Sequence, residues 1–99
     1  MNNELVGCYA TSLAGHDKGA VYIIVEIDGE YVFLSDGRIK LLEQPKKKKL
    51  KHIQIIKRKD ETIQSKSNAG QKIINEDIKH AIKLYIAQNK EVNTCQRQT

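Results

Sequence analysis

Between residues 4 and 56, short apolar stretches with a two-residue period alternate with tight polar turns, a pattern typical of β-strands. The run from Val21 to Ile27 is the richest in β-branched residues and should form the most buried strand. Asp28-Gly29 and Asp36-Gly37 predict two-residue hairpin turns of type I′, which need positive φ at both central positions. The expected strands are 4–12, 20–27, 30–35, 38–42 and 50–56.

Details within these strands add three expectations. Gly7 marks a bulge or a close backbone approach in the first strand. Pro45 ends the ladder after the fourth strand, because proline has no backbone N–H to donate. Strict alternation in the second strand puts Val21, Ile23, Val25 and Ile27 on one face and Tyr22, Ile24 and Glu26 on the other. Short strands joined by tight turns predict a mainly β fold, with an SH3-like barrel of five strands as the natural candidate.

The pattern changes in the second half of the chain. Residues 57–74 are polar and are interpreted as a linker. Asn75 is a suitable N-cap, and acidic residues follow it at the positive end of the helix dipole. The next apolar residues follow the helical repeat: Ile78, Ala81, Ile82, Tyr85 and Ile86. We therefore expect one C-terminal helix over 75–89, docked on the barrel of residues 1–56, and a frayed polar tail over 90–99.

Composition indicates one small domain with a concentrated positive charge. The chain has 99 residues and a net charge of +5, with 5% aromatic residues and no tryptophan. Residues 1–45 are acidic on balance, whereas residues 46–59 contain eight basic residues and no acid. Such a segment favours a polyanionic partner. No apolar run is long enough for a signal or a membrane span, so a cytoplasmic protein with no membrane partner is expected.

Little in the sequence suggests a metal site, a cofactor or catalysis. His16, His52 and His80 lie far apart, and no Cys or His pair has zinc-ligand spacing. Cys8 and Cys95 are expected to be free thiols, with Cys8 packed as a small apolar residue. His16 has no nucleophile or second carboxylate placed with it, so we expect no catalytic residues and no enzyme.

Two segments carry the candidate binding residues. The turn Ser12–Gly19 has glycines that let its backbone approach a ligand, and it lacks the ending of a nucleotide-binding loop. The run Lys46–Lys49 is suited to phosphate contacts without sequence discrimination. The candidate RNA-binding residues are Gly15, His16, Lys18, Gly19, Lys46, Lys47, Lys48, Lys49, Lys51 and His52. Whether the turn and the lysine run share one face is the question on which this site depends.

A family resemblance joins the two segments. Val6-Gly7, the turn Ser12–Gly19 and the apolar Val21–Val25 resemble a KOW motif, and Asp36-Gly37-Arg38 with Pro45–His52 resemble one branch of it. That branch is the small bacterial KOW-domain RNA-binding proteins, similar to a large-subunit ribosomal protein family of archaea and eukaryotes. The resemblance implies an SH3-like barrel that binds ribosomal or other structured RNA in translation, with Gly19 as the glycine that the motif requires.

A second interpretation makes the chain a protein-interaction module of a transcription or translation complex. The tyrosine-bearing sheet face or the C-terminal helix would then be the working surface. Lys46–Lys49 would be a solvated loop. The helix itself is most simply a brace for the barrel.

Overall fold

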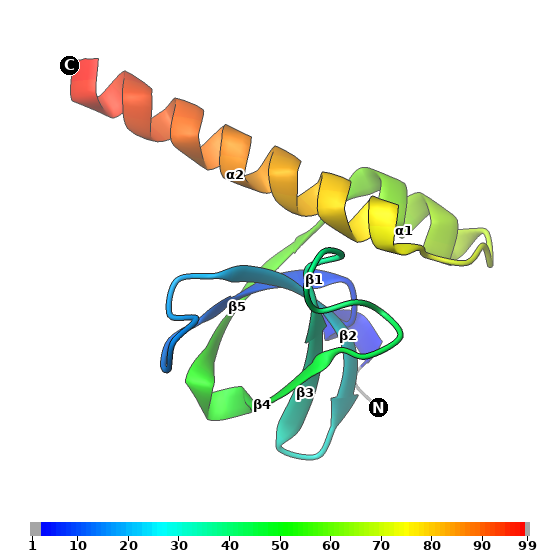
Figure 1. Ribbon diagram of the computed structural model, residues 1–99. Helices are drawn as coiled ribbons and strands as arrows, with labels where there is room; N and C mark the ends of the chain where they lie inside the picture. Colours follow the sequence, from blue (N-terminus) through cyan, green and yellow to red (C-terminus); the bar gives the residue numbers. More distant parts are fainter. Residues whose placement is uncertain (1–2, 99) are drawn as a thin grey trace.

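The chain folds into a mainly β structure with one antiparallel sheet and two α-helices (Figure 1). The computed structural model describes residues 3–98, and side chains from Glu4 to Gln88. The sheet has five strands in the order β4-β3-β2-β1-β5. It is not closed, because the edge strands β4 and β5 pair only with β3 and β1. The elements are η1 (Asn3–Leu5), β1 (Cys8–Ser12), β2 (Val21–Asp28), β3 (Tyr31–Ser35), β4 (Lys46–Lys49), η2 (Leu50–His52), β5 (Ile53–Lys59), α1 (Glu61–Asn68) and α2 (Asn75–Gln98).

The hairpin predicted near Asp28-Gly29 is confirmed, but the predicted type I′ turn is wrong. Asp28 pairs with Tyr31, so the loop residues are Gly29 and Glu30. Gly29 has φ +62°, whereas no residue other than glycine has positive φ in the part of the chain that the structure describes. A type I′ turn needs positive φ at both positions, and positive φ at the first position alone is the pattern of type II′.

A β-bulge in β2 overturns the predicted division of its side chains. Ile24 pairs with Leu34, but the next partner of β3 is Glu26, which faces Phe33. Val25 is therefore an extra residue, and the alternation of faces is reset after it. Ile27 packs with the same buried cluster as Ile24, on the opposite face from the one predicted.

The predicted strand 38–42 is also wrong, and the fourth strand lies further along the chain. One oxygen of Asp36 accepts hydrogen bonds from the amides of the three residues Arg38, Ile39 and Lys40, at 2.8–3.0 Å. These bonds curl the backbone into a compact loop that cannot join a ladder. The actual strand β4 begins immediately after Pro45, which thus opens a strand and does not end one.

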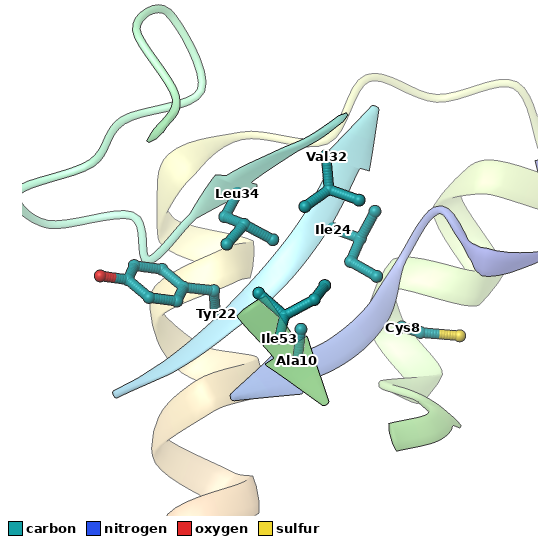
Figure 2. Close-up of a cluster of buried hydrophobic side chains, with 7 residues drawn as sticks. All are labelled: Cys8, Ala10, Tyr22, Ile24, Val32, Leu34 and Ile53. Carbon is teal, nitrogen blue, oxygen red and sulfur yellow. The ribbon is translucent and has the colours of Figure 1, made fainter. Parts of the chain in front are cut away.

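Each face of the sheet carries a cluster of buried side chains. On its inner face lies a cluster that we call the inner cluster, shown in Figure 2. It consists of Cys8, Ala10, Tyr22, Ile24, Val32, Leu34 and Ile53, and the Cys8 thiol is free. The outer cluster joins the other face to the two α-helices, and it consists of Tyr9, Ile23, Ile63, Ile78, Ala81 and Ile82.

The helices differ from the prediction in number and length. The segment 57–74 is not a linker, because β5 runs to Lys59 and α1 follows at once. Asp60 caps α1 by accepting hydrogen bonds from the amides of Thr62 and Ile63, at 2.9 and 3.2 Å. The second helix, predicted over 75–89, continues to Gln98, so most of the predicted tail is helical; Thr99 lies outside the described residues.

Helix α2 packs along the outer face through its predicted apolar stripe. Ile78 and Ala81 are fully buried, and the ring of Tyr85 stacks on Tyr9 with centroids 4.5 Å apart. The Tyr9 hydroxyl donates to the carbonyl of Ala81 at 3.2 Å. Ile86, at the end of the stripe, is 46% exposed. Within residues 3–98, neither helix combines the length and the apolar character that a membrane span needs.

Candidate nucleic-acid interface

The turn between β1 and β2 places a single carboxylate, Asp17, among four hydrogen-bond donors. Asp17 Oδ1 accepts from Ser12 Oγ at 2.8 Å and from Lys48 Nζ at 2.9 Å. Asp17 Oδ2 accepts from the Tyr22 hydroxyl and from Lys46 Nζ, each at 2.8 Å. We call these five residues the Asp17 cluster. It joins the turn to β4, which lies about thirty positions further along the chain.

The glycines of the turn make this placement possible. Gly15 and Gly19 have φ of +87° and +89°, which side-chain-bearing residues rarely adopt. The Gly19 amide donates to the Ser12 carbonyl at 2.9 Å, and the Ala20 amide donates to the Asp17 carbonyl at 2.8 Å. These bonds narrow the turn and hold Asp17 beside the ends of both strands.

The predicted lysine run is the edge strand β4, and its pleat divides the four lysines between two faces. Lys46 and Lys48 extend to Asp17, and their side chains are 30% and 11% exposed. Lys48 also donates to the Ala14 carbonyl at 3.0 Å. The other two lysines lie on the opposite face, where Lys47 Nζ is 4.4 Å from the centre of the Tyr31 ring.

Asp17 is held ionised by its neighbours. Burial tends to raise the pKa of its carboxyl, but the hydrogen bonds from Lys46, Lys48, Ser12 and Tyr22 outweigh burial and hold the pKa far below its usual range. The hydrogen bond between Asp17 and Tyr22 has the opposite effect on the pKa of the Tyr22 phenol. Burial, and then the hydrogen bond to Asp17, raise the pKa of Tyr22 well above its ordinary value. One carboxylate between two ammonium groups leaves one net positive charge.

Backbone contacts bring η2 to the same region. The Leu13 amide of the turn donates to the His52 carbonyl at 2.9 Å. At the other end of η2, the Leu50 amide donates to the Glu30 carbonyl of the β2–β3 loop at 2.8 Å. Thus η2 spans the gap between the open edges of the sheet and places Lys51, which is exposed, near the lysine strand.

The ten predicted binding residues fall into three groups. Gly15, His16, Lys18 and Gly19 are exposed on the turn, and Lys47 and Lys51 are exposed on β4 and η2. Lys49 and His52 are half-buried. Lys46 and Lys48 are held by Asp17, so they anchor the turn more than they face solvent. The turn therefore shares a face with Lys46 and Lys48 only, because Lys47 and Lys49 lie on the opposite face of β4.

Asp17 is the residue that the sequence reasoning missed. Its signal was an acid inside a turn whose other charged residues are basic, in a chain whose next strong feature is a lysine run. Only the contact with β4 gives that acid a role.

The face that carries Lys47 and Lys49 is electrically mixed. Residues directly opposite each other in antiparallel strands share a face. The register of the three strands therefore gives two rows, Glu26, Phe33 and Lys47 in one and Asp28, Tyr31 and Lys49 in the other. Acids, half-buried aromatics and lysines follow one another across the sheet. The lysines lie at the open edge, where a ligand can reach them.

Among the described residues, no group of three or more His, Cys, Asp or Glu side chains could hold a metal ion. A scan against models of protein families and a search of curated proteins returned no match for this chain.

Proposed function

We propose that this chain is a non-enzymatic RNA-binding protein of the translation apparatus, acting in the cytoplasm, with its sheet bent in the manner of an SH3-like KOW domain. The observation that carries the proposal is the Asp17 cluster, which unites the glycine turn and the lysine strand on one edge. These are the two segments on which the KOW resemblance rests. The strand order and the bridge through η2 are compatible with this fold.

In this proposal the lysines have two roles. Lys46 and Lys48 hold the turn against β4 and supply the one positive charge that Asp17 leaves. The phosphate contacts are made by the exposed cations Lys18, Lys47 and Lys51. The half-buried Lys49 adds a fourth contact. About four such contacts predict that log K falls with log salt concentration with a slope of about −2.8 to −3.6.

Residues other than lysines would add positional contacts. His16 is exposed on the turn beside Gly15 and can contact a phosphate or a base, whereas the amides of Lys18 and Gly19 already donate within the turn. Tyr31 and Phe33 are half-buried on the lysine face and offer ring surface for a base, although Lys47 already covers Tyr31.

In the second interpretation, a protein-interaction module, the apolar stripe of α2 is a candidate docking surface for a partner. Most of this stripe, including Tyr85, packs on the sheet. Among the α2 side chains that the structure describes, the large apolar residues that stay exposed are Leu84 and Ile86, at 41% and 46%.

The test replaces Lys47 and Lys49 by glutamine and measures binding of ribosomal subunits, total transfer RNA and a single-stranded RNA over a series of salt concentrations. The control is Lys57→Gln with Lys72→Gln, which removes the same charge from two exposed positions outside the candidate site. We expect the Lys47/Lys49 variant to bind about tenfold more weakly than the control at 0.15 M salt, because each phosphate contact contributes about fourfold there.

Two results would contradict the proposal. One is an affinity for every RNA that does not change with salt. The other is equal binding by the Lys47/Lys49 variant and the control. A preference among the three RNAs would identify the class of target.

A further inference from the structure

A groove on the outer face of the sheet, beside α2, carries a second set of cations. It has a volume of about 570 Å³ and runs between α2, the start of β2 and the loop that follows β3. Its charged lining consists of Arg38, Lys79, Lys83 and Asp36, and its apolar lining consists of Val21, Ile82 and Ile86. None of these residues belongs to the interface proposed above.

The charges of the groove favour an anion. Asp36 is the one acid among three cations, and one of its oxygens already accepts three backbone amides of its own loop. Lys79 pairs with Glu76 at 3.0 Å, but both side chains are well exposed, at 43% and 74%. Such a surface pair holds a lysine only weakly, so Lys79 can turn to a ligand.

The floor of the groove suits a flat apolar group. Ile82 is almost buried, at 9% exposed, whereas Ile86 is 46% exposed, so the two form a step of aliphatic surface. No aromatic side chain lines the groove. The Arg38 guanidinium is exposed and offers the planar surface on which a base can stack.

The groove and the lysines Lys47 and Lys49 lie on the same face of the sheet. Val21, which lines the groove, packs with the outer cluster, whereas the next residue, Tyr22, belongs to the inner cluster. Phe33 stands between two residues of the inner cluster, so Phe33 and its partner Lys47 also lie on the outer face. A strand of nucleic acid bound at Lys47 and Lys49 therefore reaches the three cations on one face of the sheet.

We propose that this groove receives an unpaired nucleotide of the RNA that binds at Lys47 and Lys49. Arg38, Lys79 and Lys83 contact its phosphates, and the aliphatic floor packs against its base. This inference rests on the proposed RNA-binding function and extends the RNA path from the sheet edge to α2. The shared face with Lys47 and Lys49 favours RNA over an acidic peptide.

The experiment compares Lys79→Gln/Lys83→Gln with the control Lys57→Gln/Lys72→Gln. Both variants lose two charges at partly or fully exposed positions, and equal thermal unfolding would show that both are folded. The probe is a hairpin RNA with a single-stranded tail. We expect the groove variant to bind about tenfold more weakly than the control at 0.15 M salt, with a slope shallower by about 1.4, as for two contacts to a single strand.

A second variant distinguishes the contact with the base from the contacts with the phosphates. Ile86→Gln keeps every charge and should weaken binding of the tailed hairpin by about threefold without changing the salt slope. The same hairpin without its tail should bind equally to the wild-type protein and to Ile86→Gln. Equal loss with and without the tail would overturn the assignment of an unpaired nucleotide.

Failure of this inference is distinct from failure of the proposed function. If Lys47 and Lys49 matter for RNA but Lys79 and Lys83 behave like the control, the function stands and the groove has another role. If the groove variant instead loses affinity for a short polyglutamate peptide alone, the groove is a protein site and the inference is wrong. If the wild-type chain binds no RNA, both proposals are wrong.

Discussion

Four lysines in a row occupy two different environments in this protein. Lys46 and Lys48 share one carboxylate on the side of the turn, and Lys48 is only 11% exposed. Lys47 and Lys49 lie on the other side of the same strand, where Lys47 is exposed over the Tyr31 ring. The residue type and the chain segment are the same, so the difference comes from the pleat alone.

The comparison shows that a charge run is not a uniform binding surface. When such a run forms an edge strand, alternate side chains face opposite ways. One pair then stabilises the fold, and the other pair remains available to a ligand. Adjacent positions should therefore respond differently to the same substitution, in stability on one side and in RNA affinity on the other.

We expect the largest effect on stability from removal of the Asp17 carboxylate, which holds Lys46 and Lys48. Asp17→Asn leaves Lys48 nearly buried without a counter-charge, and unfolding free energy should fall by about 3 kcal/mol, the low end for breaking a buried pair, because Asp17 keeps some exposure. Asp28→Asn is the control, since Asp28 is an exposed acid with no such partner in the described residues. Urea titration measures both variants. Equal stability of the two would show that Asp17 does not anchor β4.

Acid should produce the same effect in the unmodified chain. The pKa of Asp17 is lower in the folded state than in the unfolded state, so its stabilisation is present above the unfolded value of about 4. It is lost progressively as the pH falls below that value toward the folded pKa. Asp77 and Glu43 have lowered pKa values as well, through Lys66 and Asn75 respectively. The difference between the pH curves of the wild-type protein and Asp17→Asn isolates Asp17, and parallel curves would contradict its role.

A smaller effect should separate neighbouring lysines. Lys48→Met removes the hydrogen bonds to Asp17 and to the Ala14 carbonyl while keeping an apolar stem, and it should lower unfolding free energy by about 2 kcal/mol. Lys47→Met removes only an exposed contact with Tyr31 and should change stability by about 0.5 kcal/mol. Denaturant unfolding of both variants is the measurement. The reverse ranking would mean that the two faces of β4 had been assigned wrongly.

Local patterns predicted the parts of the fold that local interactions form. The β2–β3 hairpin follows from a glycine between two β-branched or aromatic runs, and α2 follows from its helical spacing of apolar residues. Asn75, the predicted N-cap, is instead the first helical residue, and its side-chain oxygen accepts a hydrogen bond from the Leu42 amide at 2.8 Å. The prediction failed where one residue changed the register. Val25 forms a bulge that the alternation of residue types does not predict. The bulge places Ile27 on the inner face of the sheet, opposite to the face predicted for it.

Helix α1 shows a second limit. Its only buried residue is Ile63, so the segment has almost no apolar stripe. It is a helix because Asp60 caps it and because Ile63 packs beneath α2, and a short polar segment does not reveal that contact.

What the sequence determined by itself is a mainly β chain with a glycine turn, a hairpin, an amphipathic helix and a concentrated positive charge. These features depend on neighbouring residues, whose types can be read directly. Pairing across the chain was decided only in three dimensions. Gly37, for example, looked like a turn glycine, yet an added Cβ there would meet the carbonyl oxygen of Asn75 and lie 2.9 Å from the Lys79 amide.

The lysine strand is the clearest case of that difference. The sequence predicts repulsion among four adjacent lysines and cannot say what relieves it. The fold relieves it by pairing β4 with β3 and by bringing Asp17 to two of the four ammonium groups. An ion pair between positions about thirty residues apart depends on the whole backbone path, and that path exists only when the sheet has formed.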